Sequence, residues 1–234
     1  MGSLITGHAW SAIKVPVLVT LLRDRGSQGQ LTSQERSWAQ LALTQSDNQA
    51  AIGMFSSLER AHGGLVGASA AVQQTLRRAG DPITEVNTAP NSGGFTTFGQ
   101  TVWSGRAATL FYRSLARGCL LAPTDTRYVL NLMSQVAGDQ RWGMGQVNVR
   151  GRPVAFKGGW GPETGGRYLV RQSAIVGAGA RGYVVTILAE SGVGSFETGT
   201  QALTALARWV AGHIDPALSR PSDPALSRPS AACA

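Results

Sequence analysis

Only two lysines, Lys14 and Lys157, occur among the 21 lysine and arginine residues of this chain. An arginine stays protonated in proteins, whereas a buried lysine can lose its proton and act as a base. Lys14 follows Ser11 by three positions, so the two side chains share one face if this segment is helical. A serine hydroxyl needs a base within hydrogen-bond reach to act as a nucleophile. Ser11 and Lys14 are therefore candidates for nucleophile and base, although a serine that merely opens a helix fits the same short pattern.

Two further short motifs could complete such a site. Ser46-Asp47-Asn48 offers a hydroxyl to relay a proton, a carboxylate to hold the turn and an amide for a substrate. Lys157-Gly158-Gly159, expected at the end of a strand, offers a charge near a substrate carboxylate and glycines that let the backbone approach closely. Each motif also has an ordinary interpretation, as a turn or as a strand terminus.

Taken in this order, the three motifs resemble those of the penicillin-recognising serine hydrolases, which comprise serine β-lactamases and D-alanyl-D-alanine peptidases. Pro16 strengthens the likeness, because Ser-x-x-Lys-x-Pro recurs in that superfamily. The resemblance covers roughly residues 4–214 and is loose in the helical middle. It implies an α/β (α+β) fold, a β-lactamase/transpeptidase-like three-layer sandwich in which helices flank an antiparallel sheet beside a helical lobe.

The resemblance also implies roles for four catalytic residues. Ser11 would be the acylated nucleophile, and Lys14 its base or part of the proton relay. Ser46 would pass the proton to the leaving nitrogen. Lys157 would steady both this relay and the substrate carboxylate.

Three further positions would bind the substrate. Asn48 would contact the substrate amide, and Gly159 would let the strand approach the substrate closely. The backbone N–H groups of Ser11 and Trp160 would form the oxyanion hole; removal of such a donor typically costs about 10²–10³ in rate.

The chain departs from the family pattern in three informative places. Gly158 replaces the usual Thr or Ser and removes a hydroxyl expected to grip a substrate carboxylate. Glu85 lies in the loop where class A β-lactamases carry their deacylating base, but its surroundings do not match, and an exposed loop carboxylate is the expected interpretation. The family's first helix, opening strands and export signal have no counterpart before Ser11, which is the pattern of an N-terminally truncated or degenerate member.

Three segments are expected along the chain. Residues 1–25 and 141–214 form a discontinuous sheet lobe that begins with the nucleophile helix, and residues 26–140 form a helical lobe. Residues 215–234 hold an octapeptide that occurs twice in tandem, rich in Pro and Ser, and are expected to be a disordered tail.

Hydrophobic periodicity predicts seven helices and four strands within these segments. The helices are expected at 10–22, 32–45, 49–60, 68–79, 101–118, 125–137 and 198–214, the last with Leu203, Leu206, Trp209 and Val210 on one side. The strands are expected at 146–149, 153–156, 168–178 and 182–189. Residues 81–99 are rich in Pro, Gly, Asn and Thr and predict a long, functional or mobile loop.

Composition argues against several other classes of function. The net charge of +8 is carried by scattered arginines without a basic stripe, so no nucleic-acid partner is expected. The three histidines lack metal-ligand spacing, and neither a metal nor a cofactor is expected. No stretch is long and apolar enough to span a bilayer, and no signal peptide is seen in the chain; the family resemblance nevertheless implies an extracytoplasmic location.

The sequence therefore predicts a monomeric serine hydrolase that forms an acyl-enzyme with β-lactams or peptidoglycan-like amides. A D,D-peptidase, a penicillin-binding protein or an esterase of the same fold is the enzymatic alternative. A non-catalytic relative that binds cell-wall fragments, or an inactive one, is the other. A Ser-His hydrolase built on His8 is disfavoured, because the chain lacks a Gly-x-Ser-x-Gly elbow.

Overall fold

The computed structural model describes residues 2–89, 94–177, 182–192 and 195–213. Its three strands form one antiparallel sheet in the order β1-β2-β3, with β1 at one edge. The strands are β1 (Val154–Pro162), β2 (Tyr168–Val176) and β3 (Tyr183–Ser191). The α-helices are α1 (Lys14–Arg25), α2 (Ser33–Thr44), α3 (Asn48–His62), α4 (Leu65–Arg78), α5 (Gly105–Ala116), α6 (Pro123–Ser134) and α7 (Phe196–His213).

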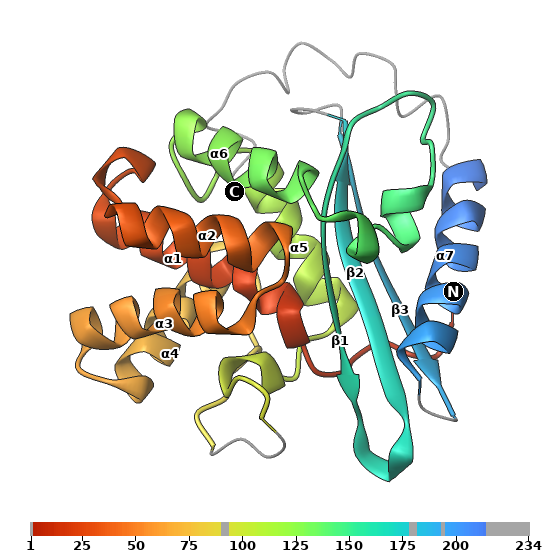
Figure 1. Ribbon diagram of the computed structural model, residues 1–234, viewed down its shortest axis with the longest axis horizontal. Coiled ribbons are helices and arrows are strands. Elements are labelled where there is room, and N and C mark those ends of the chain that lie inside the picture. Colours follow the sequence, from red (N-terminus) through yellow and green to blue (C-terminus); the bar gives the residue numbers. More distant parts are fainter. Residues whose placement is uncertain (1, 90–93, 178–181, 193–194, 214–234) are drawn as a thin grey trace.

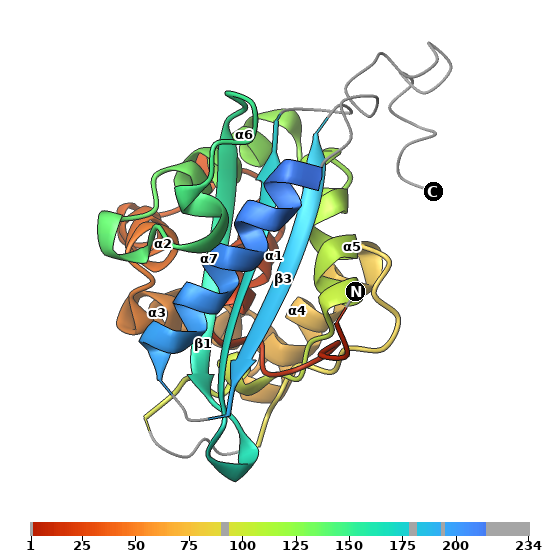
Figure 2. The same ribbon diagram turned by 90° about the vertical axis from the view of Figure 1, so that its right-hand side faces the viewer.

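Helices cover both faces of the sheet. Helix α7 packs on β2 and β3 from one side, and α5 packs on the same strands from the other (Figure 1). Figure 2 shows α7 lying along the length of the strands. Gly199 allows this close approach, because a Cβ at that position would lie 2.3 Å from a Val170 methyl carbon. The expected three-layer sandwich with its antiparallel sheet is confirmed.

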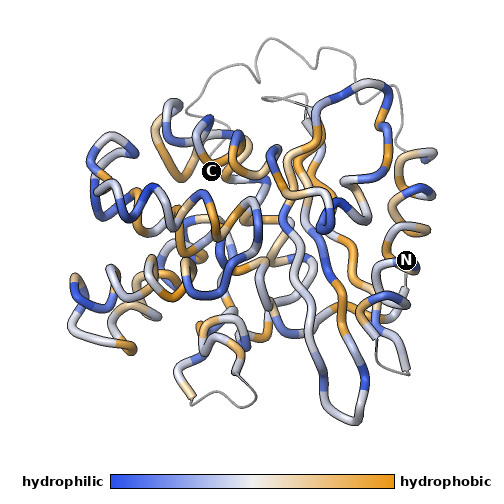
Figure 3. The backbone as a smooth tube through the Cα atoms, in the orientation of Figure 1, coloured by the Kyte–Doolittle hydropathy of each residue, from blue (hydrophilic) through white to orange (hydrophobic). Residues whose placement is uncertain are grey.

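The remaining helices pack together beside the sheet, with α1 at their centre. Helix α1 contacts α2, α3, α4 and α6, and every residue from Lys14 to Leu22 is buried, as its nearly continuous apolar sequence predicts. The outer helices alternate between hydrophobic and hydrophilic stretches (Figure 3), as helices with one face on a core do. The core therefore surrounds the helix that begins three residues after Ser11.

Local sequence signals explain where the lobe's helices begin. Thr32 and Glu35 form the expected capping box: the Thr32 hydroxyl accepts from the Glu35 N–H at 3.1 Å, and the Glu35 carboxylate accepts from the Thr32 N–H at 3.0 Å. Asp47 caps α3 by accepting from the Ala50 N–H at 2.7 Å. The capping box thus fixes the start of α2, and Asp47 fixes the end of the α2–α3 turn at which α3 begins.

Three expectations about secondary structure were wrong. Residues 146–149 form no strand; Val149 is buried beside Phe156 and Met144 without pairing to the sheet, so its alternating pattern reflects burial alone. The Lys157 motif lies within β1 rather than at a strand end. In α7, Leu206 and Trp209 are exposed, because the helix faces the sheet with residues spaced by four: Gly199, Leu203 and Ala207.

The division into lobes stays a prediction, and one helix bears on it. Helix α5 lies within the range given to the helical lobe but packs on the sheet. The repeat tail at 215–234 lies outside the described residues, as do residues 179–181 between the strands expected at 168–178 and 182–189.

Candidate active site

Ser11 lies in the short 3-10 turn Trp10–Ile13 that leads directly into α1, so Lys14 is the first residue of that helix. Trp10, just before Ser11, has a left-handed φ of 48°, which is uncommon for a residue with a side chain. Strained backbone of this kind persists only where the surrounding structure holds it. Here the indole Nε1 of Trp10 donates to the Glu163 carboxylate at 3.2 Å.

Lys14 reaches across to the turn between α2 and α3. Its Nζ donates to the Ser46 carbonyl at 2.5 Å and to Asn48 Oδ1 at 2.8 Å. The side chain is 1% exposed, and burial lowers its pKa from the ordinary 10.5 to about 7, although the Asp47 carboxylate acts in the opposite direction. Lys14 therefore loses its proton far more readily than an ordinary lysine.

Lys157 approaches the same turn from the sheet. Its Nζ donates to Ser46 Oγ at 2.7 Å and to the carbonyl of Gly158 at 3.1 Å. Burial, reinforced by the positive charge of Lys14, holds the pKa of Lys157 well below its ordinary 10.5. Ser46 is thus contacted by both lysines of the chain, through its carbonyl and its hydroxyl. Its own left-handed φ of 58° turns the chain between the two helices at this point.

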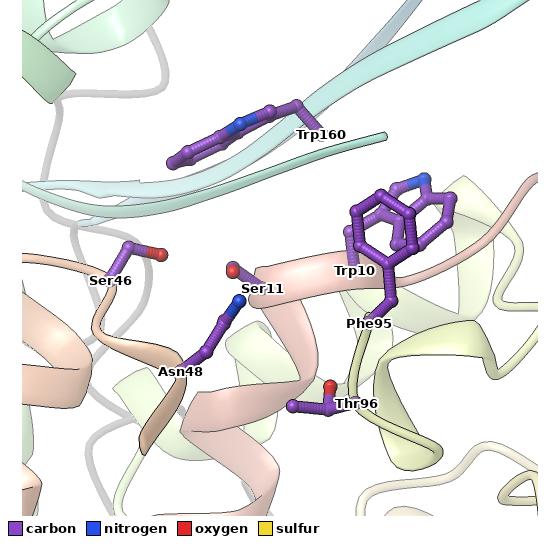
Figure 4. A pocket seen from close by; sticks show the side chains of 7 residues that line it. All are labelled: Trp10, Ser11, Ser46, Asn48, Phe95, Thr96 and Trp160. Atoms are coloured by element: carbon purple, nitrogen blue, oxygen red, sulfur yellow. The ribbon is translucent and has the colours of Figure 1, made fainter. Parts of the chain in front are cut away.

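A pocket of about 90 Å³ opens where these elements meet. Figure 4 shows Ser11, Ser46 and Asn48 directed toward one another, with Trp160 of β1 above them. The lining residues come from the Ser11 turn, the α2–α3 turn, the 81–99 loop and β1: Trp10, Ser11, Ser46, Asn48, Phe95, Thr96 and Trp160.

Strand β1 runs against the Ser11 turn closely enough to require glycine. A Cβ on Gly159 would lie 2.9 Å from the backbone nitrogen of Ser11 and 2.5 Å from the carbonyl oxygen of Ala9. Both neighbours are main-chain atoms that cannot swing aside. As the edge strand, β1 also leaves part of its main chain unpaired on the side away from β2.

Seven site residues were predicted from the sequence, and the structure brings them together. Ser11, Ser46, Asn48 and Trp160 line the pocket, whereas Lys14, Lys157 and Gly159 lie directly behind it. Glu85 is exposed and is not among the lining residues, which include no carboxylate.

The other pocket-lining residues were not predicted from the sequence. Phe95 and Thr96 belong to the loop that composition marked as functional, but nothing in the sequence singled out these two positions. Trp10 adjoins the nucleophile candidate, and its proximity to Ser11 was the only signal that could have identified it.

Comparison with known proteins places the fold. The family model described as "Beta-lactamase enzyme family" matches residues 34–214, more than half of the 234 residues. The chain belongs to the β-lactamase enzyme family. Ser11 and Lys14 precede the matched range, so the structure rather than the family model brings them to the other site residues. No curated protein sequence matches the chain.

Solved structures share the β-lactamase fold at low sequence identity. The chromosome-encoded β-lactamase of Vibrio parahaemolyticus is 16% identical, with a TM-score of 0.70 over 90% of this chain and 86% of that one. A mutant class A β-lactamase of the last common ancestor of Gram-negative bacteria is also 16% identical, with a TM-score of 0.65 over 90% and 86%. PBP-A is 20% identical, with a TM-score of 0.65 over 88% and 81%. Family and fold are those of β-lactamase-like hydrolases.

The Glu163 carboxylate ties the end of β1 to the segment before Ser11. It accepts from the Trp10 indole, from the His8 main-chain N–H at 3.2 Å and faces His8 Nδ1 at 2.8 Å. These contacts hold Trp10 in its strained conformation and thereby position Ser11.

If Ser11 is the acylated nucleophile that the sequence predicts, replacing Glu163 with alanine is expected to lower its acylation rate about tenfold, because Trp10 loses its anchor. The affinity for the unreacted substrate should change little. Single-turnover kinetics over a range of substrate concentrations separate the two quantities. Glu190→Ala is the matched control, since Glu190 pairs with Arg167 on the surface near the same end of the sheet. Equal effects of the two variants would contradict a positioning role.

Proposed function

We propose that the protein is a serine hydrolase in which Ser11 forms an acyl-enzyme with β-lactams or related cell-wall amides. The observation that carries the proposal is that both lysines converge on Ser46, with Nζ–O distances of 2.5 and 2.7 Å, at the edge of the pocket that Ser11 lines. Burial lowers both lysine pKa values, and two amines of reduced pKa around a serine-lined pocket suit proton transfer.

The hydrogen bonds of Lys14 support its role as the base. A neutral amine has two N–H groups and one lone pair, and Lys14 already donates to two acceptors, the Ser46 carbonyl and Asn48 Oδ1. In the neutral form, the position left on nitrogen is the lone pair, which can accept the proton of the Ser11 hydroxyl. The two acceptors therefore orient the amine, and its neutral form is favoured by burial.

The proposed reaction conserves every proton. The Ser11 oxygen bonds to the substrate carbonyl carbon as its proton passes to Lys14, and the backbone N–H groups of Ser11 and Trp160 stabilise the oxyanion. The carbon–nitrogen bond then breaks, and Ser46 gives its proton to the leaving nitrogen. Lys14 passes the proton that it took from Ser11 on to Ser46, while Lys157 holds the Ser46 oxygen by its hydrogen bond. Water later attacks the acyl carbon, and a proton of that water returns to the Ser11 oxygen as the ester bond breaks.

Slow release of the acyl group is favoured by one observation. The seven lining residues include no carboxylate that could activate the attacking water, and Glu85 is exposed outside the pocket. Without such a base, acylation outpaces hydrolysis, which is the behaviour of a penicillin-binding protein. This second candidate shares the first chemical step with a β-lactamase and differs from it in the fate of the acyl-enzyme.

The proposal includes the surroundings in which the enzyme works. A cell-wall substrate requires an extracytoplasmic location, and a pocket lined by one chain is compatible with a monomer. No helix among the described residues is long and apolar enough to cross a membrane.

Intact-mass measurement after incubation with benzylpenicillin tests the proposal. We expect an adduct of one penicillin per chain that is absent in Ser11→Ala and retained in Ser33→Ala, whose serine is exposed on α2. Fast substrate loss without an adduct would indicate a β-lactamase. Neither adduct nor turnover with β-lactams, D-Ala-D-Ala peptides and esters would overturn the proposal in favour of a binding or inactive relative.

A further inference from the structure

The wall of the pocket beside Gly158 is closed by an aromatic side chain. A Cβ built on Gly158 would lie 2.5 Å from the ring of Trp142, far inside van der Waals contact. Trp142 is itself 5% exposed and packs at 5.9 Å, edge to face, on Trp160, the residue of β1 that lines the pocket. Since alternate residues of a strand point the same way, a side chain at 158 would project to the same side as Trp160. In this packing the Trp142 ring leaves no room for a hydroxyl side chain at position 158.

Among the described residues, the lining of the pocket offers no charge to a bound anion. Its seven lining residues are all uncharged at neutral pH. The two buried lysines lie behind the lining, and their amines already donate to acceptors of the protein. Lys14 donates to Ser46 and Asn48. Lys157 donates to Ser46 and Gly158. The Trp142 indole Nε1 has no partner among the described residues, but it is buried and cannot reach a ligand.

An anion in such a pocket would lose its hydration without gaining a charged partner, and this costs far more than burying a neutral group. An uncharged substrate has no such cost. The Asn48 amide and the Thr96 hydroxyl can donate to its carbonyl groups, and the rings of Trp10, Phe95 and Trp160 contact its apolar parts. The chemistry of the lining therefore favours a neutral molecule.

We propose that this site does not recognise its acyl donors through a carboxylate beside the reacting bond, because the Trp142–Gly158 contact fills the place of the hydroxyl that would bind it. A neutral donor should therefore acylate Ser11 at least as fast as the matching anion. The inference rests on the proposed function, because it concerns which donors acylate Ser11. The inference assigns a role in specificity to Trp142. Among the described residues, this side chain makes no hydrogen bond with Ser11 or with the two lysines.

Benzylpenicillin and its methyl ester form a matched pair for the test, since they differ only in whether the carboxylate is free. Time-resolved intact mass gives the acylation rate of each compound. We expect the ester to acylate Ser11 at least as fast as the acid. A free acid that acylates more than about tenfold faster than the ester, the advantage expected of a charge-assisted hydrogen bond, would overturn the inference and leave the proposed function intact. Failure of both compounds, together with simple neutral esters, would instead count against the proposed function itself.

A pair of variants tests the role of Trp142. In Trp142→Leu/Gly158→Thr the space for a hydroxyl is restored, and we expect the acid-to-ester rate ratio to rise about tenfold over that of Trp142→Leu alone. A thermal melt verifies that both variants fold. An unchanged ratio in folded protein would contradict the role of this contact.

Discussion

Replacing Lys14 with methionine is expected to reduce the acylation rate about a thousandfold, the typical contribution of a general base. Methionine matches the length and apolar stem of lysine and fits the buried site, so the loss would report the missing amine rather than a cavity. Stopped-flow or intact-mass kinetics with a β-lactam measure it. Lys14→Arg serves as a second variant, because an arginine keeps the charge but cannot accept a proton. If Lys14→Arg retained activity, the amine would not be the base.

The pKa of Lys14 also fixes the expected pH dependence. Because the neutral amine is the reactive form, the acylation rate of the wild-type enzyme should rise through pH 7. Stability should respond as well. Between the folded pKa of about 7 and the ordinary 10.5, the unfolded chain binds more protons than the folded one, so the free energy of unfolding increases with pH over this window. Lys14→Met should flatten this rise, leaving the part that Lys157 contributes in the same direction.

Replacing Gly159 with alanine is expected to destabilise the fold by about 3 kcal/mol and to abolish acylation. The added methyl group would meet three main-chain atoms of the Ser11 turn at 2.5 to 2.9 Å, the Ala9 carbonyl oxygen and the nitrogens of Ser11 and Ala12. Relief requires β1 and the turn to separate, which would also move the two N–H groups proposed for the oxyanion hole. Chemical denaturation and acylation kinetics measure the two effects.

Gly138→Ala is the control for this prediction. A Cβ on Gly138 would have nothing within 4 Å, so this variant should match the wild type in both measurements. A stable and active Gly159→Ala enzyme would show that the strand and the turn are not locked in the geometry described.

The chemistry of the site was predictable because its residue types are scarce. Two lysines stood out among arginines, and Ser46-Asp47-Asn48 lay between them. The order and spacing of these motifs were the basis of the resemblance to the penicillin-recognising serine hydrolases. The antiparallel sheet and the helix starts followed from period and capping signals, as at Thr32. What each of these residues does in catalysis stays a prediction.

Other features depend on contacts that a linear pattern does not contain. The obstruction at Gly158 needs a ring from residue 142, and Phe95 reaches the pocket from a loop without periodic structure. The pattern at 146–149 suggested a strand, but the sheet gives this segment no partner. Leu206 and Trp209 looked like core residues because their spacing is helical. Gly199, Leu203 and Ala207, on another side of the helix, face the sheet instead.

Helix α1 begins at the candidate base and is enclosed on every side by the other helices of its lobe, from Lys14 to Leu22. Such an element cannot open by fraying or by the detachment of a surface loop; its amides become accessible only when the whole lobe comes apart. Lys14 is therefore held with the cooperativity of the entire domain. Heat or denaturant should abolish catalysis in the same transition that melts the molecule, with no inactive but folded species beforehand.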